Sequence, residues 1–266
     1  MATTWLGLIV GPSVAGLRLT FATPVWLCAV DAASFLVGIA CVALLRRPES
    51  RPQVTARGLG ERWHLIIDGV ALVWRDARLH ALVVSWTAFA GLAGAFSPVS
   101  QVFYLRELGF TPSEYALILG LPSIGGLAGS WVTRHGAERL GLDRTLRLAS
   151  WGRSALYLLY PLLVGGTLGV VLTAVLFAAT LFTTSLANSS MGAIRVRATP
   201  GTHQARVAAL WSFTGMAAGP VLIAATTPAL QAFGPRPVLA GICVAVALIP
   251  LLLPRATGGS AAGDTC

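Results

Sequence analysis

The chain has 266 residues, of which 55% are hydrophobic and only 11% are charged. A soluble domain carries about 25% charged residues, and one soluble core of this size cannot bury so much apolar surface. This composition excludes an ordinary soluble enzyme, a disordered chain and a disulfide-rich scaffold. The net charge of +9 does not indicate a nucleic-acid-binding face, because the basic residues lie in short loops between apolar runs. We therefore predict an all-α, polytopic membrane protein.

Eight apolar stretches are each long enough to cross the hydrocarbon layer as a helix, which takes about 20 residues. The stretch from Leu146 to Ile194 is too long for one crossing, and the sequence Gly165-Gly166-Thr167 offers the turn that divides it. The eight predicted spans are Thr3–Thr20, Pro24–Leu45, Leu79–Tyr104, Pro112–Val132, Leu146–Val164, Leu168–Ile194, Val207–Leu230 and Pro237–Leu253.

The Arg residues are distributed unequally between the connections, and the chain contains no Lys. One set of alternate connections holds seven, five, three and one Arg, whereas the other set holds one, one, none and one. We place Arg134, Arg139, Arg144, Arg147 and Arg153 in the connection with five. Because Arg-rich connections face the cytoplasm, this pattern predicts a multi-pass protein of the cell membrane with both termini cytoplasmic.

Residues 46–78 form the one substantial segment outside the predicted spans. They separate two helices in residues 1–45 from a predicted six-helix bundle in residues 79–254, and residues 255–266 are a predicted cytoplasmic tail. The part from Glu61 to Asp76 places apolar side chains on one helical stripe, namely Trp63, Ile66, Ile67, Val70 and Trp74. This pattern predicts an amphipathic helix, which either lies in the cytoplasmic interface of the membrane or packs against the bundle as a lid.

A pair of consecutive helices recurs in the sequence after six helices. The first and seventh spans share a motif, Gly7-x-x-x-Gly11-Pro12 and Gly215-x-x-x-Gly219-Pro220, and the span after each one opens with Pro-Val. Parallel repeats of six spans are one plan on which transporters are built. The eight spans then correspond to helices 5–12 of a twelve-helix transporter, and we expect a missing N-terminal segment of four helices before Met1.

The arrangement resembles the major facilitator superfamily, and within it the drug and siderophore exporters related to macrolide-efflux and enterobactin-export proteins. The first repeat, with Ala15-Gly16 after it, is similar to the antiporter motif of the family's fifth helix, and Asp31-Ala32-Ala33-Ser34-Phe35 is similar to its sixth helix. Gly129-x-x-x-Thr133-Arg134-x-Gly136 is a weak copy of the family's cytoplasmic Gly-x-x-x-Asp-Arg-x-Gly-Arg-Arg loop. The resemblance implies proton-coupled efflux of small amphipathic or drug-like molecules, with Gly-Pro bends that help two bundles rock.

Nothing in the sequence predicts enzymatic chemistry. No nucleophile, base and orienting group have the spacing that catalysis needs, no Gly-rich phosphate loop is present, and the cysteines lack metal-ligand spacing. We therefore predict that the protein is not an enzyme and needs no cofactor or metal. Its expected partners are the lipid bilayer and a small-molecule substrate.

Asp31 is the acidic residue that lies well inside a predicted span, where an unpaired charge costs several kcal/mol. Two interpretations remain open. In one, Asp31 takes up and releases the coupled proton; in the other, it forms a structural ion pair with Arg18 of the preceding helix. An Asp31→Asn variant distinguishes them, because unchanged proton coupling contradicts the first interpretation.

Other polar residues are candidates for a central cavity, although each can instead bond a neighbouring helix. These residues are Gln101, Tyr104, Asn188 and Ser189. Gly125 and Gly129 are four residues apart within one span, and this spacing predicts close packing against another helix.

Two further hypotheses for the function remain open, an eight-helix permease subunit that works with a separate ATPase and an inactive remnant. Alternating access needs two bundles around a midplane site. We therefore expect that cells expressing these 266 residues alone accumulate drugs as control cells do. Reduced accumulation without any added helices would contradict the expected N-terminal segment.

Overall fold

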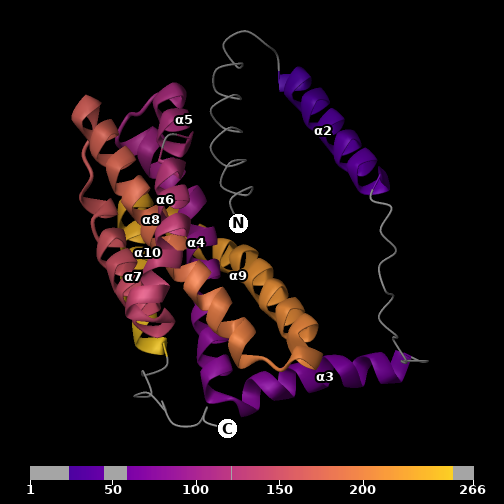
Figure 1. The fold of residues 1–266 in the computed structure, drawn as a ribbon. Coiled ribbons are helices and arrows are strands. Elements are labelled where there is room, and N and C mark those ends of the chain that lie inside the picture. Colours follow the sequence, from indigo (N-terminus) through magenta and orange to yellow (C-terminus); the bar gives the residue numbers. More distant parts are fainter. Residues whose placement is uncertain (1–23, 45–58, 121, 254–266) are drawn as a thin grey trace.

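The computed structural model describes residues 24–44, 59–120 and 122–253, and all the regular structure in these ranges is helical. Figure 1 shows most of the helices gathered in one bundle. The helices are α2 (Pro24–Leu44), α3 (Leu59–Arg75), α4 (Ala77–Val102), α5 (Pro112–Gly120), α6 (Ser123–Leu140), α7 (Leu142–Tyr157), α8 (Gly166–Ala198), α9 (Gln204–Phe233) and α10 (Pro235–Leu248). A π-helical turn, η1 (Phe103–Glu107), follows α4, and the short 3₁₀ helices are η2 (Tyr160–Leu162), η3 (Gly201–His203) and η4 (Ile249–Leu252). The predicted all-α fold is confirmed for the described residues.

Five helical stretches of the described residues are long and apolar enough to cross a membrane. They are Ala77–Glu107, Pro112–Thr133, Gly166–Ala198, Gly201–Phe233 and Pro235–Leu252. The predicted turn before the sixth span is confirmed, because Gly166 has a φ of +80° and begins α8. Of the other predicted spans, Thr3–Thr20 lies outside the described residues, and α2 occupies Pro24–Leu44 with a shorter apolar stretch at Ala32–Cys41.

Proline interrupts two of the predicted spans. The prediction of one helix over Leu146–Val164 is wrong, because α7 ends at Tyr157 and a short 3₁₀ turn follows. Pro161 explains the end, since it has no N–H to donate to the Tyr157 carbonyl and its ring clashes with that carbonyl in a helix. In the predicted span Pro112–Val132, Pro122 likewise lies between the end of α5 and the start of α6.

The bundle from α4 to α10 consists of two interlocking triplets of opposite direction. The members of the first triplet are α4, then α5 and α6 taken together, and then α7. The members of the second triplet are α8, α9 and α10. The first member of each triplet packs most closely on the second member of the other, α4 on α9 and α8 on α6. The first member of each also packs on the third member of the other, α4 on α10 and α8 on α7. The bundle therefore has the contact pattern of an inverted repeat.

The seam between α4 and α9 is a close approach of two backbones. A Cβ atom added to Gly94 would lie 2.8 Å from the Cα atom of Gly219, and one added to Gly91 would lie 3.0 Å from the Ala218 Cβ atom. Nearer the start of both helices, a Cβ atom on Gly215 would lie 2.6 Å from Nε1 of Trp86. The second copy of the repeated Gly-Pro motif thus supplies the surface on which α4 packs.

The seam between α6 and α8 repeats this arrangement. A Cβ atom added to Gly125 would overlap the carbonyl oxygen of Ala178, and one added to Gly129 would overlap that of Phe182. The predicted close packing at these two glycines is confirmed. The predicted loop motif around Gly129 lies within the helix α6, where the Thr133 hydroxyl donates to the Gly129 carbonyl at 2.7 Å.

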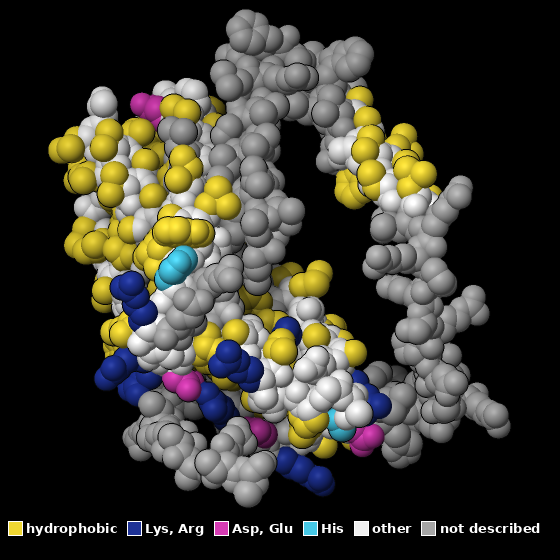
Figure 2. All heavy atoms as spheres, viewed as in Figure 1, with side chains coloured by type: hydrophobic (Ala, Val, Ile, Leu, Met, Phe, Trp, Pro, Cys, Tyr) yellow, Lys and Arg dark blue, Asp and Glu magenta, His cyan; other side chains and the backbone are white. Residues whose placement is uncertain are grey.

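Arg residues collect at the end of the bundle where α4, α7 and α9 begin and where α6 and α8 end, which we call the Arg-rich end. Figure 2 shows these dark-blue side chains at the lower end of the molecule, below a mostly hydrophobic upper part. At this end, Arg78 of α4 forms an ion pair with Asp143 of α7 at 2.6 Å. At the opposite end, Arg236 pairs with Glu107 at 2.5 Å.

Helix α3 packs across the starts of α4 and α9 (Figure 1). A Cβ atom on Gly69 would lie 2.9 Å from the Cβ atom of Arg206, and Val73 packs with Val83 and Val207 in a small buried cluster. Of the predicted apolar stripe, Ile67 is 55% exposed and Trp74 is 69% exposed, and the Trp74 ring contacts that of His80 at a centroid distance of 4.5 Å. These two side chains therefore lie mostly outside the contact between α3 and the bundle.

We expect Gly125→Ala to lower the stability of the protein by about 1–3 kcal/mol, because the added methyl group overlaps the Ala178 carbonyl and forces the seam apart. Unfolding of the purified protein in mixed micelles measures this loss. Gly241→Ala is the matched control, since no atom lies within 4 Å of an added Cβ on this exposed glycine of α10. Equal stability of the two variants would show that the seam accommodates the added methyl group without separation of α6 and α8.

Candidate functional site

A cavity of about 250 Å³ lies between α4, α5, α7 and α8. Its lining combines six aromatic rings with four hydroxyl side chains and four aliphatic ones. The lining residues are Phe89, Ala93, Phe96, Ser97, Ser100, Tyr104, Tyr115, Ile118, Leu119, Tyr157, Phe177, Thr180, Leu181 and Thr184. Such a lining binds amphipathic molecules, because rings supply apolar contact and a few polar groups fix orientation.

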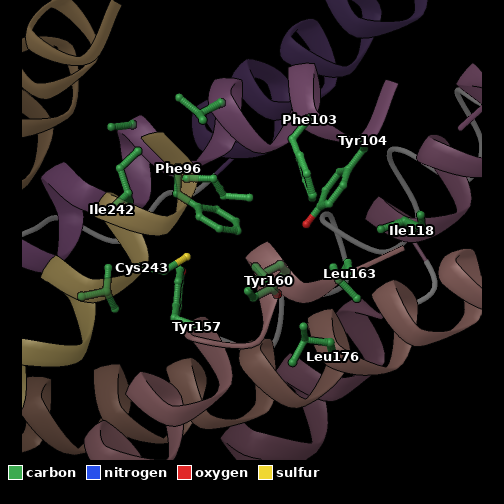
Figure 3. Packing of buried hydrophobic residues seen from close by; sticks show 14 of the residues in the cluster. Phe96, Phe103, Tyr104, Ile118, Tyr157, Tyr160, Leu163, Leu176, Ile242 and Cys243 are labelled. Carbon is green, nitrogen blue, oxygen red and sulfur yellow. The ribbon is translucent and has the colours of Figure 1, made fainter. Parts of the chain in front are cut away.

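The aromatic rings on this lining pack edge to face. Phe96 meets the ring of Tyr157 at a centroid distance of 5.0 Å and that of Tyr160 at 4.9 Å. Figure 3 shows these rings together, with the hydroxyl oxygen of Tyr104 directed into the interior of the cluster. Edge-to-face pairs are worth about 0.5–1.5 kcal/mol each beyond their buried area, so this part of the lining is rigid.

A buried hydrogen-bond chain stabilises the side of the cavity formed by α8. The Tyr160 hydroxyl donates to Oγ1 of Thr180 at 3.1 Å, and the Thr180 hydroxyl donates to the Leu176 carbonyl at 2.8 Å. Both Tyr160 and Thr180 are at most 3% exposed. The chain therefore satisfies two hydroxyls that would otherwise be buried without a partner.

Arg153 lies directly behind the cavity wall, and this position was not predicted from the sequence. Its assignment to an Arg-rich connection is wrong, because the side chain is 1% exposed within α7. The guanidinium carbon lies 3.6 Å from the centroid of the Phe89 ring, whereas Nε and Nη1 have no hydrogen-bond partner among the described residues. The position of Arg153 inside the predicted span Leu146–Val164 was the signal that could have found it.

Several other buried polar atoms in α4, α7 and α8 also lack a hydrogen-bond partner among the described residues. They belong to Ser85, Thr87, Ser150, Ser185, Asn188 and Ser190. Buried polar groups in proteins are nearly always bonded, so a group of unpartnered ones needs an explanation.

The structure separates the four predicted cavity residues. Tyr104 lies on the cavity wall, whereas Gln101 is exposed, and Asn188 and Ser189 do not line the cavity. Phe96 and Tyr157 were not predicted, because an aromatic residue in an apolar run gives the same pattern whether it packs in a core or lines a site.

The other predicted site residues fall mostly outside the part of the chain that the structure describes. This holds for Gly7, Gly11, Pro12 and Arg18, and for the side chain of Asp31 on α2. In the second repeat, Gly215 and Gly219 lie in the seam with α4, and α9 continues through Pro220.

Comparison with known proteins decides the family. A sequence model of the Major Facilitator Superfamily matches residues 1–224. The chain belongs to the major facilitator superfamily. No curated protein and no solved structure matches it. Each six-helix half of these transporters is built from inverted triplets, as is the bundle from α4 to α10.

Membership makes the chain a secondary transporter with several membrane-spanning helices. The described residues of this superfamily member contain no group of three His, Cys, Asp or Glu side chains that could hold a metal ion.

We expect Thr180→Val to destabilise the protein by about 1–3 kcal/mol, because it leaves the Tyr160 hydroxyl buried without an acceptor. In a Tyr160→Phe background the same substitution should cost much less, since the hydroxyl that needs the acceptor is gone. Denaturant unfolding of the four proteins in this cycle measures the coupling. Equal costs of Thr180→Val in both backgrounds would contradict the hydrogen bond.

Proposed function

We propose that the chain functions in a secondary active exporter that couples efflux of small amphipathic or drug-like molecules to the proton gradient. Membership of the superfamily supports secondary transport in general. The observation that carries the substrate class is the cavity, whose rings and hydroxyls suit a molecule with both apolar and polar parts.

The size of the cavity supports a role as part of a larger site. Ligand pockets usually measure roughly 300–1,000 Å³, whereas this one measures about 250 Å³. Transporters of this plan bind substrate near the membrane midplane between two bundles. We infer that the cavity receives one part of the substrate and that a facing bundle encloses the rest.

Asp31 is our candidate for the group that carries the proton. It lies on α2, and a carboxylate inside a span costs several kcal/mol unless it is paired, protonated or in contact with water. This cost is small while water reaches the carboxylate, which then stays charged. It is large when the site closes to water, which favours the protonated form. A conformational change would therefore accompany each protonation step.

Transport in liposomes tests the coupling. Purified protein is reconstituted with an amphipathic fluorescent dye, a pH gradient is imposed and no nucleotide is added. For the protein that includes the four expected N-terminal helices, we expect dye movement that a protonophore abolishes. Movement that ignores the pH gradient but requires ATP and a membrane extract would contradict the proposal and favour a permease with a separate ATPase.

Filling the cavity tests the substrate site. We expect Ala93→Phe to reduce dye transport at least about tenfold, because the new ring occupies space between α4 and α8 and removes about 1.4 kcal/mol of binding or more. Val244→Phe adds the same ring to an exposed position of α10 and should leave transport unchanged. Dye transport at the wild-type rate in the folded Ala93→Phe protein would show that substrate binds elsewhere.

A further inference from the structure

We propose that Arg153 is the centre of an anion-binding site inside the bundle. The ligand is a group with one negative charge, either the carboxylate of an amphipathic substrate or a halide ion. The substrate carboxylate rests on the proposed function, because this part of the proposal adds a negative charge to the amphipathic substrates named above.

The charge of Arg153 is not neutralised within the described residues. Neither of the described ion pairs includes it. Four described carboxylates are engaged elsewhere, namely Asp143 with Arg78, Glu107 with Arg236, Asp76 with the first N–H groups of α4, and Glu114 with Thr111. Asp68 is exposed on α3. A charge buried inside a membrane bundle costs several kcal/mol, and a hydrogen bond to a neutral group does not neutralise it.

Free hydrogen-bond donors lie on α7 and α4. Among the described residues, Nε and Nη1 of Arg153 have no acceptor, and the hydroxyls of Ser85 and Ser150 are equally buried and unpartnered. Both serines are at most 1% exposed. Guanidinium N–H groups and hydroxyls are the donors that bind carboxylates and halides, and the charged donor roughly doubles the strength of such a bond.

Two of these hydroxyls lie at a similar level of the bundle. Phe89 contacts the guanidinium, and Ser85 lies one turn, or about 6 Å, toward the Arg-rich end of α4. Ser150 lies about 4.5 Å from Arg153 in the same direction along α7. Two helices thus place buried hydroxyls within about one turn of Arg153 and of the ring that it contacts.

The guanidinium lies next to the cavity. The ring of Phe89 lies against the guanidinium, and both Phe89 and Tyr157 also belong to the cavity wall. One layer of rings therefore separates the positive charge from the cavity. A rotation of Phe89 would expose the guanidinium to a molecule bound in the cavity.

Thermal unfolding of the purified full chain in detergent tests the site. The probes are sodium chloride, sodium 2-naphthoate and the neutral 2-naphthamide, at an ionic strength held constant with sodium sulfate. We expect a saturable rise of the unfolding midpoint with chloride, with naphthoate or with both, and none with naphthamide, because a ligand that binds the folded state raises its stability. A response to chloride alone identifies an inorganic ion, and a response to naphthoate identifies a substrate carboxylate.

Arg153→Met should weaken anion binding about tenfold to a hundredfold, since it removes charged hydrogen bonds. Arg236→Met removes an exposed Arg at the opposite end and should bind as wild type does. If Arg153→Met does not fold, Ser85→Ala with Ser150→Ala replaces it, with weaker binding expected. A wild-type midpoint that no anion raises, or anion affinity unchanged in these variants, overturns the proposal. Because the assay needs no transport, a protein that binds anions but ignores a pH gradient contradicts the proposed function alone.

Discussion

The close approach of helix backbones at two glycine seams is the constraint on which the bundle depends. Lipid gives helices no hydrophobic reason to associate, so van der Waals contact between small residues must hold them together. Gly94 against Gly219 and Gly125 against Ala178 provide this contact at equivalent places of the two triplets. A side chain at either glycine would separate helices that the rest of the bundle needs in contact.

The seams also determine where the cavity lies. Its walls come largely from α4 and α8, and each of these helices belongs to one seam. Rings from α5 and α7 complete the cavity wall, and Arg153 of α7 lies behind the ring of Phe89. A site that combines rigid rings with an uncompensated charge is costly to keep, and the tight packing on both sides is what supports it.

The order and type of the helices could be predicted from the sequence, because long apolar runs leave few alternatives in a membrane. The spacing of Gly125 and Gly129 also predicted a close helix contact, since small residues one turn apart in a membrane helix allow another helix to approach closely. The interruption at Pro161 follows from the same kind of rule, but the length of the apolar run concealed it. The contact of Arg153 with the ring of Phe89 could not be predicted, because the two residues lie on helices far apart in the sequence.

The seam between α4 and α9 has one further consequence. Bare backbone faces bare backbone at Gly94 and Gly219, so this stretch offers little resistance to sliding. Toward the Arg-rich end, however, the indoles of Trp86 and Trp211 stack at a centroid distance of 5.1 Å, and Nε1 of Trp86 donates to the Trp211 carbonyl. Axial movement of one helix along the other must first separate these indoles, so the pair opposes such movement.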